Sequence, residues 1–225
     1  SCLKVLDITS NDLGDFDHDG GHTPAASALI DFAIAPLRDL RIGGRESSNG
    51  GPSRSPAKTL SWAVASFGSL VTLDAREACI EDDSLIAFSA SMASSSGVAL
   101  KYLDVSWNEI TDEGVIALLD GLLYGRARLR HLDLGVNQLG DEGCKAIGMA
   151  MLPGAALSSL HELSLRSNCI AHVGSIRKAL ASCQLEVLDL RENLIAEDEI
   201  RELLLECDSR NLTTHARFAG NDLSE

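Results

Sequence analysis

The pattern most suggestive of metal chemistry lies near the N-terminus, in the segment 15–26, DFDHDGGHTPAA. Its first half matches an EF-hand calcium loop through Asp15, Asp17, Asp19 and Gly20. The second half does not match, because Ala26 stands where a bidentate glutamate helps to complete the calcium shell. We therefore expect an acidic surface loop here, and we predict no metal or other cofactor.

Catalytic sequence patterns are missing from the chain. It contains no phosphate-binding loop GxxxxGKS/T, no nucleophile elbow GxSxG and no zinc-binding helix HExxH. The histidines are scattered, and catalysis by any of them would need a positioned partner that the sequence does not indicate. We predict that the protein is not an enzyme.

Charge and composition narrow the class of partner and the compartment. Acidic residues outnumber basic ones by 33 to 19, which leaves a net charge of −14 that would repel nucleic acid and anionic membranes. We therefore expect a protein partner with a basic or mixed surface. No signal peptide or membrane-spanning run is visible, and we expect a cytoplasmic location. The cysteines are spread singly, which favours free thiols: Cys2, Cys79, Cys144, Cys169, Cys183 and Cys207.

One short pattern, Leu-x-x-Leu-x-Leu-x-x-Asn-x-Leu, recurs along the chain at intervals of 25 to 34 residues. Strong copies begin at Leu3, Leu100, Leu129, Leu160 and Leu185. Weaker copies begin at Leu37, Leu70 and Thr213. Positions one, four and six point inward from a short strand, and the asparagine at position nine can bond backbone groups where the chain leaves that strand. Stacked repeats would therefore form leucine layers and an asparagine ladder.

Helical spacing of apolar residues follows several strand windows, in the segments 113–122, 142–151, 175–182 and 199–207. Neither a strand nor a helix of this kind can bury its apolar face alone. Stacking of successive strand-helix units buries both, with strands on the inner curve and helices on the outer one. This pattern predicts an α/β solenoid of about eight repeats.

The repeats resemble the leucine-rich repeat family, specifically its ribonuclease-inhibitor-like subfamily. The strand windows carry the resemblance, together with NEITDEG at 108–114 and NQLGDEG at 137–143, which look like the subfamily's asparagine, apolar residue and glycine before the helix. The resemblance implies a right-handed horseshoe with a parallel sheet on the concave face and helices on the convex face. It leaves function open, because such repeats occur in enzyme inhibitors, innate-immune receptors, the Ran GTPase-activating protein and cytoskeletal or ciliary scaffolds.

Two features depart from a regular repeat. Arg45 and Ala78 replace the position-nine asparagine in the second and third windows, so we expect the ladder to be interrupted there. The adjoining segment 43–58 is rich in Gly, Ser, Pro and Arg and is typical of a flexible insertion within the second repeat. We interpret residues 1–225 as one repeat domain, cut from a longer protein because no polar terminal cap is recognisable.

The predicted concave face carries the candidate binding residues. Side chains at positions three, five, seven and eight are expected to face solvent there, and position five is mostly aspartate. Trp107 stands at position eight, where an exposed tryptophan favours an interface. Its alternative is packing against the adjoining loop, and the aspartates have the alternative of pairing with neighbouring arginines. The predicted contact centre is Tyr102, Asp104, Trp107, His131, Asp133, Arg166 and Asp189.

We interpret the chain as a non-enzymatic module that binds a partner protein on this concave face. One alternative is a GTPase-activating role of the Ran-activating type, which a GTPase stimulation assay would reveal. Another is a structural or regulatory repeat segment of an immune-type receptor or of a cytoskeletal or ciliary assembly. The sequence leaves the partner's identity and the oligomeric state open.

Overall fold

The computed structural model describes residues 4–7, 37–42, 60, 68–95, 97–209 and 216–221. The acidic segment 15–26 and the insertion 43–58, including Arg45, lie outside the described residues. The predictions made for these two segments therefore stay predictions.

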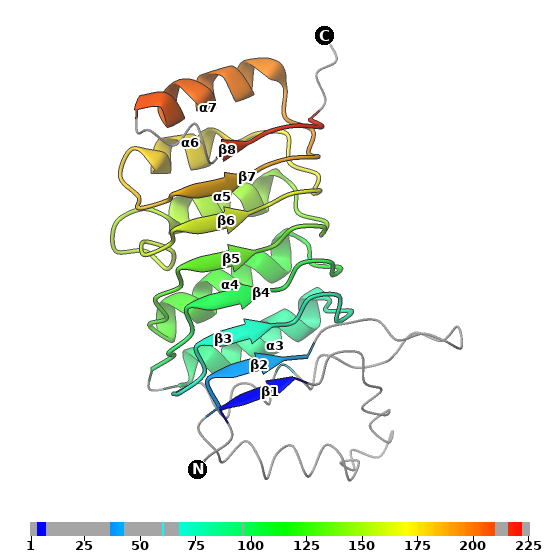
Figure 1. The fold of residues 1–225 in the computed structure, drawn as a ribbon, viewed down its shortest axis with the longest axis vertical. Coiled ribbons are helices and arrows are strands. Elements are labelled where there is room, and N and C mark those ends of the chain that lie inside the picture. Colours follow the sequence, from blue (N-terminus) through cyan, green and yellow to red (C-terminus); the bar gives the residue numbers. More distant parts are fainter. Residues whose placement is uncertain are drawn as a thin grey trace, which may run out of the picture.

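Eight short strands form one parallel sheet in chain order (Figure 1). They are β1 Val5–Asp7, β2 Asp39–Arg41, β3 Thr72–Asp74, β4 Tyr102–Asp104, β5 His131–Asp133, β6 Glu162–Ser164, β7 Val187–Asp189 and β8 Ala216–Arg217. Strands β1 to β7 occupy positions three to five of their windows, and β8 begins one position later. The pairing never slips, so equivalent positions lie side by side across the sheet. The prediction of eight stacked repeats is confirmed.

The helices cover one face of this sheet (Figure 1). They are α3 Asp82–Ala93, α4 Asp112–Tyr124, α5 Asp141–Ala150, α6 Gly174–Leu180 and α7 Glu197–Ser209. The last four agree with the segments expected from helical spacing, whereas α3 was not among them. We call the opposite, uncovered face of the sheet the concave face. Within the described residues, no helix is long and apolar enough to cross a bilayer.

The core lies between the sheet and the helices, and position four of each strand window supplies its central layer. These leucines are at most 1% exposed in the middle of the stack: Leu73, Leu103, Leu132, Leu163 and Leu188. Full burial of one leucine contributes about 1.5–3 kcal/mol. The buried residues form a single cluster that extends from Leu37 to Cys207, so each repeat is stabilised by contact with its neighbours.

A ladder of buried asparagines closes the edge where the chain leaves the strands. The Asn108 side-chain oxygen accepts hydrogen bonds from the backbone N–H groups of Ala78 (3.0 Å) and Ile80 (2.9 Å). Its amide nitrogen donates to three carbonyl oxygens, of which the nearest is that of Val105 at 2.8 Å. The equivalent residues Asn137, Asn168, Asn193 and Asn221 are also buried and bond in the same way. The predicted ladder is confirmed from Asn108 onwards. Ala78 has no side-chain amide, and only its backbone N–H bonds to the ladder, as a donor to Asn108.

Aspartates at the helix starts link each repeat to the next. Asp82 accepts hydrogen bonds from the backbone N–H groups of Thr111 (2.9 Å) and Gly114 (3.1 Å) at the start of α4. A Cβ on Gly114 would overlap the Asp82 carboxylate, which explains the glycine in the repeated Asp-Glu-Gly sequence. Gly114 and Gly143 are the third residues of α4 and α5, as the helical segments 113–122 and 142–151 implied, and do not precede the helices as the resemblance implied. The close contact is needed inside the first turn.

Candidate functional site

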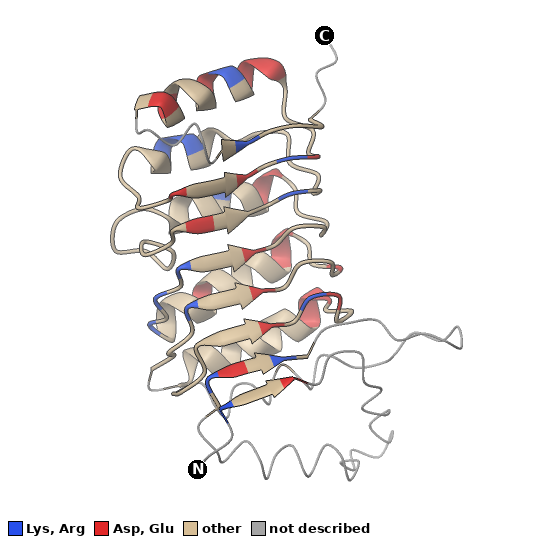
Figure 2. Ribbon diagram, in the orientation of Figure 1, with Lys and Arg blue, Asp and Glu red and all other residues tan. Residues whose placement is uncertain are grey.

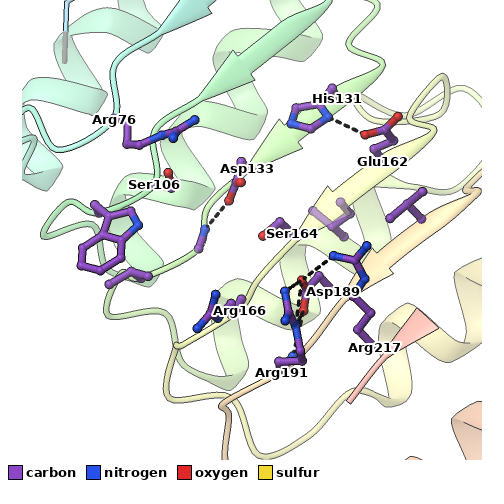
Figure 3. A pocket seen from close by; sticks show the side chains of 15 residues that line it. Arg76, Ser106, His131, Asp133, Glu162, Ser164, Arg166, Asp189, Arg191 and Arg217 are labelled. Carbon is purple, nitrogen blue, oxygen red and sulfur yellow. Dashed lines mark hydrogen bonds and ion pairs between the residues drawn. The ribbon is translucent and has the colours of Figure 1, made fainter. Parts of the chain in front are cut away.

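A hollow of about 440 Å³ lies on the concave face and extends over residues from Arg76 to Arg217 (Figure 3). Five of the seven predicted contact residues line it: Trp107, His131, Asp133, Arg166 and Asp189. The other two lie next to it, since Tyr102 contacts His131 and Asp104 binds Arg76. The strand register explains this convergence, because parallel pairing sets equivalent positions of successive repeats side by side.

The two ring-bearing residues of β4 and β5 stack on each other. The Tyr102 and His131 ring centroids are 4.1 Å apart and the rings are inclined by only 8°. His131 Nδ1 lies 2.9 Å from Glu162 Oε2, so this nitrogen carries the proton that the carboxylate accepts (Figure 3). His131 Nε2 is buried and has no hydrogen-bond partner among the described residues. The stack therefore contains one polar atom that is unpaired among the described residues, and this atom is buried.

Asp104 is the first residue whose position differs from the expectation. It was expected to face solvent, but it is only 1% exposed. Arg76 Nε and Nη2 both donate to its Oδ2, and Ser106 donates to Oδ1 through its backbone N–H and its hydroxyl. Arg76, from the preceding repeat, covers the Asp104 carboxylate. The charge exposed to solvent at this point is therefore that of Arg76 and not that of Asp104.

Asp189 is also buried, at 6% exposure, where an exposed carboxylate was expected. Arg191 binds it through Nε and Nη2, the latter at 2.6 Å, and Arg217 Nη1 lies 3.7 Å from Oδ2 (Figure 3). Burial alone would raise the pKa of Asp189, but the hydrogen bonds from Arg191 and the charges of both arginines outweigh it and lower that pKa below its ordinary value.

Asp133 occupies the same position on β5 but has no ion pair within the described part of the chain. Its Oδ1 accepts a hydrogen bond of 2.8 Å from the backbone N–H of Gly135. Burial is the largest influence and raises the pKa of Asp133, and the hydrogen bonds from Gly135 and Ser164 offset this only in part. Asp133 is thus the partly exposed carboxylate at the floor of the hollow.

Gly135 leaves room for this hollow. It occupies position seven, where neighbouring repeats carry Ser106 and Arg166. A Cβ on Gly135 would lie 3.0 Å from Asp133 Oδ1 and 3.2 Å from the Ser164 hydroxyl oxygen, both tighter than usual contacts. The missing side chain keeps Asp133 uncovered.

Arg166 does not pair with an aspartate of the sheet. Its Nη2 lies 2.6 Å from Glu192 Oε1, and Ser167 also donates to this glutamate. These hydrogen bonds lower the pKa of Glu192, with the one from Arg166 the stronger. Arg166 Nε is buried without a partner among the described residues. The predicted contact residue is therefore held by a neighbouring repeat while keeping one unused donor.

Trp107 is 57% exposed at the edge of the hollow. Its backbone adopts φ 59°, in the left-handed region that bulky residues avoid. Every described position-eight residue shares this conformation: Glu77, Val136, Ser167, Glu192 and Gly220, besides Trp107. The turn is required where the chain leaves each strand, and it directs the position-eight side chain away from the core. The ring is exposed, as an interface requires, and the interface itself stays a prediction.

Several residues of the site were not among the predicted contacts. Arg191 and Arg217 line the hollow, and Glu192 holds Arg166. Glu77 and Glu109 lie beside Trp107 in a second, smaller pocket. A usable signal was the Gly at position eight in the last window, which suggests a left-handed turn at that position in all windows.

The described part of the chain offers no metal site, and several of its cysteines are free thiols. It contains no group of three or more His, Cys, Asp or Glu side chains that could hold a metal ion. Cys79, Cys144, Cys169 and Cys207 are free thiols. Burial raises the pKa of Cys144 to about 12, so this thiol stays protonated and unreactive.

Charge is distributed unevenly over the repeats (Figure 2). Acidic residues end β3, β4, β5 and β7 and open the first turns of α3, α4, α5 and α7. Carboxylates at helix N-termini are favourable, since they face the positive end of the helix dipole. The helix-starting carboxylates are therefore accounted for by the fold, whereas two of the strand-end carboxylates, Asp133 and Asp189, line the hollow.

Comparison with known proteins gives a family match and a similar solved structure. The family model "Leucine Rich repeat" matches residues 1–15, 100–119 and 129–148. No curated protein matches the chain. Among solved structures, the chain is similar to an internalin from Listeria monocytogenes, with 15% identity and a TM-score of 0.34. That similarity covers 88% of this chain and 65% of the internalin chain. The matched repeats and the eight parallel strands with helices on one side identify the fold as an α/β solenoid of leucine-rich repeats.

Proposed function

We propose that the chain is a non-enzymatic module that binds a partner protein across its concave face. The observation that carries this proposal is the hollow, where charged side chains of both signs from several repeats meet an exposed tryptophan. Small-molecule sites are mostly apolar with a few polar groups, whereas this hollow is lined chiefly by charged and polar residues. Tryptophan and arginine are the residue types enriched at protein interfaces.

The partner has a basic or mixed surface, and nucleic acid and membranes are not bound. The net charge of −14 supports this choice through long-range attraction of cationic surfaces. The hollow also presents Asp133, which has no ion pair with a described residue, next to several arginines, which suits a surface of mixed charge. We place the protein in the cytoplasm, which the free thiols support. The Asp-Glu-Gly helix starts support the ribonuclease-inhibitor-like type of repeat.

A crosslinking experiment tests this function. A photo-reactive amino acid at Ser164, in the hollow, is expected to capture one protein in cells that express this chain. The same amino acid at Glu142, on helix α5, is the matched control. Titration of the captured protein is then expected to show about 10- to 30-fold weaker binding to Trp107→Ala, as for an interface hot spot. Lys145→Ala on α5 should bind normally. Equal losses for both variants would contradict the proposal.

A further inference from the structure

A second pocket, which we call the edge pocket, lies beside Trp107. It encloses about 160 Å³ and is lined by Glu77, Cys79, Trp107, Asn108, Glu109 and Val136. Drug-sized ligands occupy sites of roughly 300–1,000 Å³, so the edge pocket has room for a single side chain instead. Trp107 and Val136 line both pockets, which makes them the ridge between the two.

The charge of the edge pocket is of one sign. Its charged lining residues are Glu77 and Glu109, and neither forms an ion pair with any residue that the structure describes. Arg76 follows the same strand but is held by Asp104 at 2.6 Å. Asn108 is occupied by the backbone groups of the ladder. Two unneutralised carboxylates therefore flank an exposed indole ring.

The conformation of Trp107 indicates that the ring is kept for contact and not for stability. A bulky residue at φ 59° is strained, and an exposed ring gains little from packing. The Trp107 N–H donates to the Gly135 carbonyl at 2.9 Å, and the Asn108 N–H donates to that of Val136 at 3.2 Å. These bonds hold the turn whatever side chain stands there, so glycine or asparagine would fit the backbone better than tryptophan.

We propose that the edge pocket receives one arginine or lysine side chain of the partner protein. The cationic head lies over the Trp107 ring between the Glu77 and Glu109 carboxylates, and its aliphatic stem packs on Val136. A cation over an indole face is attracted by the ring's electron density, and two carboxylates add direct charge pairing. This inference rests on the protein-binding function proposed above and names the side-chain class that the partner inserts.

The experiment uses the whole chain and short peptides whose central residue alone differs. Acetyl-Gly-Arg-Gly-amide and its Lys counterpart are titrated while the Trp107 indole N–H resonance is followed by NMR, with acetyl-Gly-Gln-Gly-amide as the neutral control. The cationic peptides are expected to shift this resonance saturably and the neutral peptide is not. The resonance is assigned by its loss in Trp107→Asn, which separates it from that of Trp62.

Charge-removing variants then locate the cation. Glu77→Gln and Glu109→Gln are each expected to weaken binding about twofold to fivefold, the range of one exposed ion pair. Glu192→Gln is the matched control, since it alters another position-eight glutamate that is already paired with Arg166. An equal shift with the neutral peptide, or equal weakening by Glu192→Gln, overturns the proposal. Loss of binding in Asp133→Asn alone also overturns it, because the cation would then occupy the hollow.

The two proposals fail separately. If crosslinking shows partner binding in the hollow but cationic peptides leave Trp107 unaffected, the protein-binding function stands and the edge pocket does not take a basic side chain. If the peptides bind as expected but no partner is captured at Ser164, the edge pocket accepts cations and the concave face is not the main interface.

Discussion

The two halves of the concave face differ in the ion pairing and exposure of the side chains at equivalent repeat positions. Around β7, Asp189 is clamped by Arg191 and approached by Arg217, and Glu192 is bound by Arg166. Around β4 and β5, Arg76 binds Asp104 in the same manner, but two ring side chains stack, Trp107 is exposed, and Asp133, Glu77 and Glu109 have no ion pair with a described residue.

This difference separates stabilising charge from charge available for recognition. Carboxylates that already accept from arginines gain little from a partner, because their pairs would have to be broken first. Carboxylates without such pairs, beside an exposed indole, can form new contacts at a lower free-energy cost, because no existing ion pair has to be broken. The half of the face around β4 and β5 is therefore where we expect recognition, and the half around β7 supports the stack.

The largest expected effect tests whether the asparagine ladder stabilises both halves of the concave face equally. Asn108→Ala and Asn193→Ala each remove a buried side chain that bonds several backbone groups. Each is expected to lower the free energy of unfolding by about 3 kcal/mol, because buried N–H and C=O groups lose their partners. Urea unfolding measures both losses, and Gln138→Ala on the exposed surface is the control. Very unequal losses would mean that the halves differ in backbone as well as in charge.

The next effect distinguishes paired from unpaired aspartates. Asp189→Asn is expected to lower the free energy of unfolding at pH 7 by about 1–2 kcal/mol, since charge-assisted hydrogen bonds from Arg191 are weakened. Asp133→Asn is expected to leave stability unchanged or slightly increased, because it removes a partly buried charge that has no arginine. Chemical unfolding of both variants and of the wild type measures these changes in the free energy of unfolding. A loss in Asp133→Asn as large as in Asp189→Asn would remove the contrast.

A smaller effect follows from the opposite pKa shifts of these two residues. The pKa of Asp189 is lowered in the folded state, so its contribution is present above the unfolded pKa of about 3.9 and is lost as pH falls through the folded pKa. The pKa of Asp133 is raised, so its contribution is present below the unfolded value and is lost as pH rises through the folded pKa. Unfolding at steps from pH 7 to about pH 2 should show the wild type losing its advantage over Asp189→Asn below the unfolded pKa.

Over the same pH range, the wild type should regain stability relative to Asp133→Asn as the solution becomes more acidic. The two stability differences should therefore change in opposite directions with pH. Differences that stay constant with pH, or that change in the same direction for both variants, would show that the two aspartates ionise alike.

The smallest effect on stability concerns the ridge between the two pockets. Trp107→Asn and Val136→Asn both replace a strained side chain by one that tolerates the left-handed turn. Each is expected to stay within about 0.5 kcal/mol of the wild type, and the thermal midpoint measures this. Only Trp107→Asn should weaken partner binding strongly. A thermal destabilisation of Trp107→Asn by several degrees would show that the ring belongs to the core.

Local sequence was sufficient to predict the features that repeat. Leucines at fixed spacing predicted the strands, and the asparagine at position nine predicted the ladder that begins at Asn108. Four helices were also recognisable. Helix α3 was not recognised, because its serines and alanines give weak helical periodicity, and packing against α4 supplies what the sequence lacks.

The sequence indicated that aspartates of the sheet could pair with neighbouring arginines, but it did not indicate which residues pair. Arg76 binds Asp104, which lies 28 residues away in the sequence. Arg166 binds Glu192 and no described aspartate of the sheet. Such choices depend on side-chain reach across neighbouring strands, and the repeat pattern offers several partners at similar separation. For this reason two of the expected surface carboxylates, Asp104 and Asp189, proved to be buried.

By itself, the sequence determined that this chain stacks strand-helix units, because regularly spaced apolar residues can be buried in no other way. It also determined that the body is acidic. Only the tertiary structure decided which carboxylates are neutralised by arginines and which stay open beside Trp107. The physical reason is that burial and ion pairing depend on distances between repeats, and those distances exist only once the repeats are stacked.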